Sequence, residues 1–236
     1  MAESPTPPVS DDPAHTFLTT LPFFHGVPEA SLDKAISHLV TRTYPPNQII
    51  LLEKDWGGSV YFIQSGWVKI RTYNLDGKEI TLNILGAGEP FGEMAALEEG
   101  TRSTDVIALT PTTISSIPAA DFIDLVHTEP LVGVRLAQLM AKRLRQINRR
   151  LQVRETNSLA RVADTLVFLA ESQGQAAGQS GIQIPSLPHR ELSSLSGLAR
   201  ETVTRVLTKL EKKGLIRRTP DALVIPDLRA LDEIIH

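Results

Sequence analysis

Residues 189–213 read HRELSSLSGLARETVTRVLTKLEKK, and this stretch decides the fold of the C-terminal part of the chain. Its apolar periodicity predicts two helices, at 189–196 and 200–213, separated by a three-residue turn. The turn begins with Gly197, which suits the sharp bend between the paired helices of a helix-turn-helix.

Two short apolar runs follow this helix pair. They cover 215–218 and 222–225 and flank the turn-forming pair Pro220-Asp221. We expect them to form a two-stranded wing, so the C-terminal part is predicted to be a winged helix-turn-helix.

The second helix of the pair has two chemically different faces. Its apolar face points inward and consists of Val203, Val206, Leu207 and Leu210. Its outer face carries groups that could enter a DNA major groove together: Arg200, Glu201, Thr204, Arg205 and Thr208. Arginine can donate twice to guanine, and glutamate can accept from the cytosine amino group. Thr202 and Lys209 are expected at phosphates, which position a protein without reading sequence.

The charge distribution agrees with a DNA-binding end. Residues 190–218 contain eight basic and three acidic residues, a net charge of +5, although the whole chain has a formal net charge of -3. A basic surface for a polyanion must therefore be local. The competing interpretation is a solvated amphipathic helix, but that does not account for the bend glycine and the wing together.

Upstream, residues 48–118 have a β pattern. Six short β-rich runs are separated by glycine-containing turn signals at intervals of roughly 8–12 residues, which favours an antiparallel barrel or jelly roll. The runs are IILLE, VYFIQ, WVKIRTY, EITLNIL, TDVIAL and TTISSI. Residues 16–43 are expected to be helical, and the proline-rich residues 1–15 are expected to form a disordered tail.

A long helix is predicted between these parts, from about residue 131 to about residue 156, after Pro130. Four apolar residues recur along it at spacings of 4, 3 and 4, with arginines and lysines around them: Met140, Leu144, Ile147 and Leu151. This narrow stripe is typical of a coiled-coil seam, so we expect two chains to pair along it. The alternative is a helix that packs within one monomer.

The expected organisation is thus α+β. A tail (1–15) precedes a β domain (16–129), a dimerisation helix (130–157) and a winged helix-turn-helix (158–236). No cysteine occurs, which excludes disulfides, thiolate zinc sites and cysteine-ligated iron–sulfur clusters. No run approaches the ~20 apolar residues that span a bilayer, so we expect a cytoplasmic protein without a membrane partner. We also expect no metal and no enzymatic activity, since no nucleophile–base set, metal-ligand spacing or Walker-type loop is present.

Two motifs resemble those of a known family. Residues 200–207, RETVTRVL, resemble the recognition helix of the CRP/FNR family, and residues 91–104, FGEMAALEEGTRST, resemble the phosphate-binding cassette of cyclic-nucleotide-binding domains. In the CRP branch, an Arg-Glu-Thr-Val-x-Arg core reads a TGTGA-like half-site, which implies that Arg200, Glu201 and Arg205 are base readers here. The resemblance implies a homodimeric transcription regulator gated by cyclic AMP, with double-stranded DNA and RNA polymerase as partners.

The cassette suits a cyclic phosphate diester. Arg102 would pair with the phosphate, and the Ser103 hydroxyl would donate to it. Glu93 would accept from the ribose 2′-hydroxyl, and Gly92 would let the backbone approach the ligand. The full expected effector set is Gly92, Glu93, Met94, Arg102, Ser103 and Asn148.

The sequence departs from cyclic-AMP sensors of this family in the long helix and in the cassette. Ile147 and Asn148 stand where those sensors place hydroxyl residues, and only Asn148 can donate to a purine. The cassette is also one residue shorter between Gly100 and Arg102. The open alternatives are a regulator of the same fold that responds to 2-oxoglutarate through Arg145 or Arg149, or one that a protein partner controls. In the latter, Glu93 and Arg102 would pair with each other.

Overall fold

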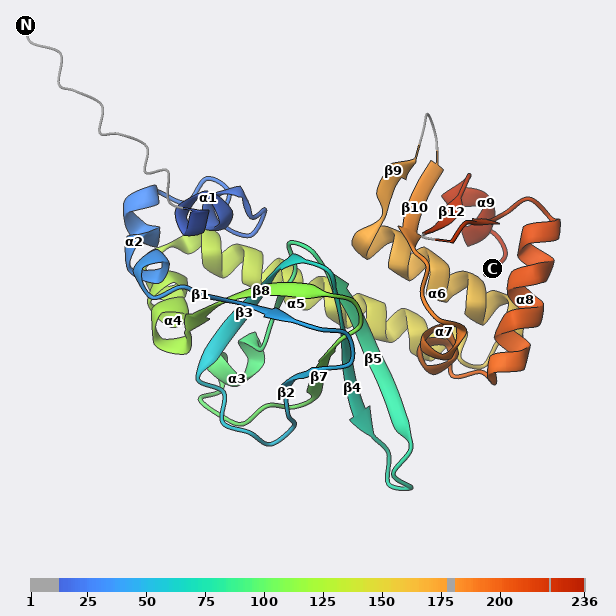
Figure 1. Cartoon of the computed structure of the whole chain (residues 1–236), viewed down its shortest axis with the longest axis horizontal. Coiled ribbons are helices and arrows are strands. Elements are labelled where there is room, and N and C mark those ends of the chain that lie inside the picture. The colour runs from blue at the N-terminus through green and yellow to red at the C-terminus, as the bar shows by residue number, and fades with distance from the viewer. Residues whose placement is uncertain (1–12, 178–180, 221, 236) are drawn as a thin grey trace, which may run out of the picture.

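The computed structural model describes residues 13–177, 181–220 and 222–235. Figure 1 shows a β domain and a C-terminal domain joined by one long helix. The α+β class and the order of the parts predicted from the sequence are confirmed.

The N-terminal region differs from its prediction in two places. Helix α1 (Pro13–Thr20) begins three residues inside the predicted tail, because Pro13 fits the first turn of a helix and Leu18 is fully buried. Residues 1–12 of that tail lie outside the described residues. Helix α2 (Glu29–Ser37) ends before residue 43, and β1 (Val40–Tyr44) is a strand that pairs with β8. Its alternating β-branched residues favour that extended pairing.

The β domain consists of two four-stranded antiparallel sheets, ordered β1-β8-β3-β6 and β2-β7-β4-β5. All six predicted runs form strands, and β1 and β6 were not predicted. The remaining strands are β2 (Ile49–Leu51), β3 (Ser59–Ser65), β4 (Trp67–Tyr73), β5 (Glu79–Gly86), β6 (Pro90–Phe91), β7 (Asp105–Ala108) and β8 (Thr112–Pro118). Apolar side chains from both sheets form a core that includes Ile63, Val68 and Phe91.

One short helix lies within the β domain, and two further helices lead from the last strand of the sheets to the C-terminal domain. Short α3 (Glu93–Leu97) follows β6, and α4 (Ala119–Thr128) leads into α5 (Pro130–Val153). Helix α5 has Pro130 at its start and 24 residues, so it is about 36 Å long at 1.5 Å per residue.

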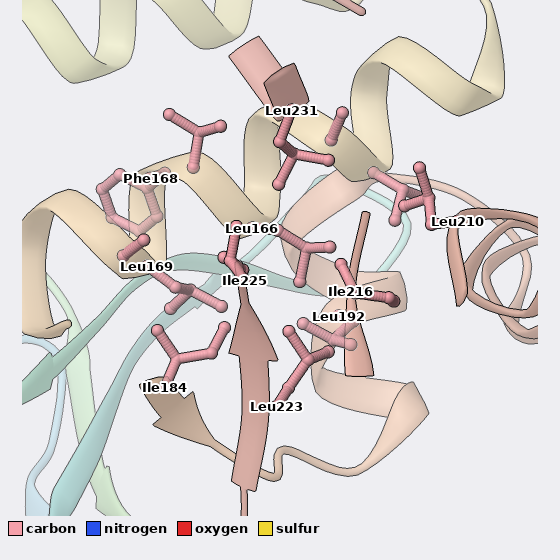
Figure 2. Packing of buried hydrophobic residues seen from close by; sticks show 14 of the residues in the cluster. Leu166, Phe168, Leu169, Ile184, Leu192, Leu210, Ile216, Leu223, Ile225 and Leu231 are labelled. Carbon is pink, nitrogen blue, oxygen red and sulfur yellow. The ribbon is translucent and has the colours of Figure 1, made fainter. Parts of the chain in front are cut away.

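The C-terminal domain contains the predicted helix pair, α7 (His189–Ser196) and α8 (Arg200–Lys212). Gly197 adopts the left-handed conformation between them, with φ of 65°. The other elements are α6 (Ser158–Gln173), β9 (Gln175–Ala177), β10 (Gly181–Pro185), β11 (Arg217–Arg218), β12 (Ala222–Ile225) and α9 (Leu228–Asp232). Figure 2 shows how their apolar side chains pack around Leu166, Leu192 and Ile225.

The sheet of the C-terminal domain has more strands than the two predicted for the wing. The two wing strands pair as expected, but β10 pairs with β12 and makes a four-stranded sheet, ordered β11-β12-β10-β9. Residues 171–181 are rich in Gln, Gly, Ala and Ser, a composition that predicts a loop. This prediction is wrong at its start, where α6 continues to Gln173 and β9 follows, and residues 178–180 lie outside the described residues.

The two domains are docked on each other. Helix α7 lies against β5, as Figure 1 shows. Lys69 of β4 pairs with Glu191 of α7 at 3.0 Å, and Thr81 of β5 donates to the Ser194 hydroxyl at 2.7 Å. Ile84 of β5 belongs to the same apolar cluster as the core of the C-terminal domain.

Candidate effector cavity and DNA-binding surface

One cavity of about 1040 Å³ lies where the two domains and α5 meet. Strand β5, the cassette around α3, one face of α5 and the segment from Ser193 to Ala199 all line it. A ligand inside would therefore contact both domains.

Arg102 is held at the cavity wall by backbone groups. Its Nη1 donates to the Gly92 carbonyl and its Nη2 to the Ser59 carbonyl, both at 2.8 Å. The guanidinium lies 5.3 Å from the centre of the Tyr61 ring, where cation–π attraction adds to the hydrogen bonds. Gly92 has φ of 79°, a conformation that favours glycine, and a Cβ there would meet Arg102 Nη1 at 2.7 Å and displace the guanidinium.

Glu93 is buried and has a partner that the sequence did not reveal. Its Oε1 accepts from Arg143 Nη1 at 2.6 Å, and Arg143 Nη2 also donates to the Pro90 carbonyl at 2.5 Å. Glu93 therefore pairs with Arg143 of α5, and not with Arg102 as the alternative interpretation required. In the sequence, Arg143 is only one of the basic residues that surround the apolar stripe, because the tertiary fold alone brings it to the cassette.

Two buried polar atoms at this wall have no protein partner. They are Glu93 Oε2, a hydrogen-bond acceptor, and Arg102 Nε, a donor. Buried polar groups are normally satisfied, so this pair is a specific indication of a polar ligand. An acceptor for a hydroxyl and a cationic donor for an anion are the two functions that the cassette chemistry requires.

Not all of the remaining predicted effector residues line the cavity. Met94 and Ser103 are exposed and line the cavity. Asn148 is exposed on α5 and does not line the cavity, whereas Ile147 does. The chain thus brings together five of its six predicted effector residues, and leaves Asn148 apart.

Helix α8 presents the predicted DNA-reading face. Its inward apolar residues are all buried, while Arg200, Glu201, Thr204, Arg205 and Lys209 are exposed. Thr202 is half-buried, and its hydroxyl accepts from Arg205 Nη2 at 3.4 Å. Burial, with the positive charges of Arg218 and Arg200, lowers the pKa of His189 beside this face. Burial is the larger cause, and the two arginines add a smaller electrostatic contribution of the same sign.

The predicted dimer seam is mostly open. Leu144, Ile147 and Leu151 are 59%, 54% and 59% exposed. Met140 differs, because it packs partly against the apolar core of its own β domain. Three large apolar side chains in a row on one helix face form an unusual exposed stripe for a soluble helix.

The described residues contain no group of three or more histidine, cysteine or acidic side chains arranged to hold a metal ion. None of the helices within 13–177, 181–220 and 222–235 is both long and apolar enough to cross a membrane.

Comparison with known proteins agrees with this geometry. Residues 41–129 match the family model for the cyclic nucleotide-binding domain, and residues 160–234 match that for the Crp-like helix-turn-helix domain. The chain is 36% identical over 214 residues to the cyclic AMP receptor protein of Thermus thermophilus, covering 90% of this chain and 96% of that one. It is 29% identical over 199 residues to the cAMP-activated global transcriptional regulator CRP of Salmonella typhimurium, covering 84% and 94%.

Among solved structures, FixK2 of Bradyrhizobium japonicum shares the fold, with a TM-score of 0.72 at 20% identity over 84% of this chain and 98% of that one. The two matched domains, their order and the extent of the similarity to the Thermus protein lead to one conclusion. The chain belongs to the CRP/FNR family of DNA-binding transcription regulators that carry a cyclic nucleotide-binding domain.

Proposed function

We propose that this protein is a homodimeric transcription regulator whose binding to a TGTGA-like palindrome is controlled by cyclic AMP. The observation that carries the proposal is the pair of unpartnered buried atoms, Glu93 Oε2 and Arg102 Nε, in a cavity that both domains line. Two of its relatives are named for cyclic AMP, which supports this choice of nucleotide.

The ligand would use the wall as follows. The cyclic phosphate accepts from Arg102, and the nearby Ser103 hydroxyl adds a neutral donor. The ribose 2′-hydroxyl donates to Glu93 Oε2, while Arg143 holds the other carboxylate oxygen in place. Cyclic AMP supplies the anion and the hydroxyl together, so it satisfies both orphan atoms at once.

The output would come from two copies of α8. Leu144, Ile147 and Leu151 would pair with the same residues of a second chain. Because these side chains are exposed, the pairing would break no contact within the monomer. DNA binding then requires two recognition helices about 34 Å apart, one turn of the duplex. The base readers would be Arg200, Glu201 and Arg205. The DNA backbone or base edges would be contacted by Thr202, Thr204 and Lys209. The DNA-bound dimer would then bind RNA polymerase.

The 2-oxoglutarate alternative finds less support. Of its two candidate arginines, Arg149 already pairs with Asp164 at 2.5 Å and with Asp232 at 2.6 Å. Glu93 would also place a carboxylate beside a dicarboxylate ligand, which is repulsive.

Isothermal titration of the full chain with cyclic AMP, cyclic GMP and 2-oxoglutarate tests the proposal. We expect heat with cyclic AMP, loss of that heat in Arg102→Ala, and no change in the control Arg42→Ala, an exposed arginine of the same domain that does not line the cavity. No heat with any ligand, from a protein that still shifts a TGTGA-type palindrome, would instead indicate a regulator that a protein partner controls.

A further inference from the structure

We propose that Arg150 is a second anchor of the effector, and that its free Nη2 donates to the N7 atom of a purine base. This rests on the proposed function, because it assigns the base-recognition residue of the same cavity. The ligand class is a purine cyclic nucleotide.

Arg150 is fixed at the junction of three elements. From α5, its Nη1 donates to the Leu82 carbonyl of β5, and its guanidinium lies 4.2 Å from the centre of the Phe168 ring of α6. These two contacts hold the planar group in one orientation. They leave Nη2 buried without a partner.

The unpartnered atoms in the described residues occur together. The three buried side-chain atoms that lack a partner are Glu93 Oε2, Arg102 Nε and Arg150 Nη2, and all three residues line the same cavity. The first two match a ribose and a phosphate. The third is a cation that has no carboxylate within ion-pair distance among the described residues, and its burial lowers the pKa of Arg150 to about 10. A buried donor without a partner lowers the stability of the folded protein, and a hydrogen bond to an acceptor on a ligand would recover that free energy.

The position of Arg150 suits the base of the nucleotide. Arg143, Ile147 and Arg150 lie on one face of α5 and line the cavity in that order. Arg143 holds Glu93 at the ribose end, and Arg150 follows two helical turns later, about 10 Å along the axis. The base would therefore extend along α5 past Ile147, which lies between the cavity and the seam, with Arg150 at its far edge.

The chemistry then selects a class of base. Phosphate and ribose are common to all cyclic nucleotides, so Arg102 and Glu93 cannot distinguish one base from another. Ile147 has no donor or acceptor. A guanidinium is donor-only: both purines present N7 to it as an acceptor, whereas cytosine presents an amino donor at that edge, and uracil is the one ribonucleotide pyrimidine with an acceptor (O4) there.

The test compares cyclic AMP with 7-deaza-cyclic AMP, which lacks only the N7 acceptor, by titration calorimetry. For the unmodified chain we expect the deaza analogue to bind about 10-fold more weakly or worse, since the lost hydrogen bond has a charged donor. In Arg150→Met the two ligands should bind equally, both near the weaker value. Arg42→Met should retain the full preference.

The outcomes separate the two proposals. If the unmodified chain does not bind cyclic AMP, the proposed effector fails and the anchor fails with it. If it binds cyclic AMP, loses binding in Arg102→Ala, but does not distinguish the deaza analogue, only the anchor is overturned. Persistence of the N7 preference in Arg150→Met would also overturn it. Arg150→Lys, which keeps a donor and the positive charge, serves as a folded variant, and it should retain part of the preference.

Discussion

The contact between α7 and the β domain provides the sharpest test of how the two domains are held together. Lys69 and Glu191 are 8% and 2% exposed, and the pair joins β4 to α7. The perturbation is a double-mutant cycle of Lys69→Met, Glu191→Gln and the two combined. Because both charges are buried, removal of one leaves the other without part of its compensation.

The expected loss of unfolding free energy depends on the ion-pair partners that each charged residue keeps. Breaking a buried ion pair by removing one partner typically costs about 3–5 kcal/mol. Here Lys69 keeps Glu79 at 2.6 Å, and Glu191 keeps Arg190, whose side chain is 65% exposed, at 2.9 Å. We therefore expect each single change to lower the free energy of unfolding by about 2 kcal/mol, with a coupling energy between them of about 1–2 kcal/mol.

Urea unfolding followed by tryptophan fluorescence measures these values. The chain has two tryptophans. Trp56 is 74% exposed, whereas Trp67 packs against the apolar cluster shared with the C-terminal domain. A Trp56→Phe background thus leaves one reporter at the domain junction.

The exposed pair Lys34–Asp124 serves as the control, and a cycle there should give less than about 1 kcal/mol. Additivity of Lys69→Met and Glu191→Gln to within about 0.5 kcal/mol would refute the stabilising contact between these two residues.

Three further outcomes are expected. Arg205→Ala should cost about 1–3 kcal/mol at a guanine contact and relax specificity there, and an unchanged profile across half-site variants would remove it as a reader. Ile147→Lys should weaken the dimer, as measured by sedimentation. The control Leu75→Lys, at a fully exposed hairpin tip, should leave the dimer unchanged, and equal effects of the two changes would reject the seam. Burial raises the pKa of Glu89 to about 7, whereas the unfolded chain releases this proton near pH 4.5. Stability should therefore fall as pH rises from about 4.5 to 7 and level off above that. Glu89→Gln should remove up to about 3 kcal/mol of that fall in denaturation curves, and an unaltered pH profile would contradict it.

The sequence was sufficient for features with local causes. The inward face of α8, from Val203 to Leu210, is recognisable because helical periodicity depends only on spacing along the chain. The turn at Gly197 is recognisable because few residues tolerate its left-handed conformation. The cassette residues Arg102 and Glu93 could be found because one continuous segment carries both.

Features that depend on distant partners were missed for a physical reason. Strand β1 was expected to be helical, and it is extended because β8, some 70 residues later, supplies its hydrogen-bond partners. Arg143 lies 50 residues from Glu93, and nothing in its neighbourhood on α5 distinguishes it from the arginines that face solvent. Arg150 contacts Leu82 and Phe168, which belong to two different domains, so its environment exists only after they dock.

A second set of polar contacts links α5, which lines the cavity, to the turn before α8. Arg161 of α6 donates to the carbonyls of Ser196 and Gly197, and so fixes the turn before α8. Arg149 of α5 joins α6 and α9 through Asp164 and Asp232, which makes the end of α5 and the C-terminal domain one connected unit. Under the proposed function, a ligand on the cavity face of α5 would therefore contact a helix that is linked to the support of α8. If the proposed effector alters DNA affinity through this support, thermodynamic reciprocity requires that DNA binding alter effector affinity by the same factor.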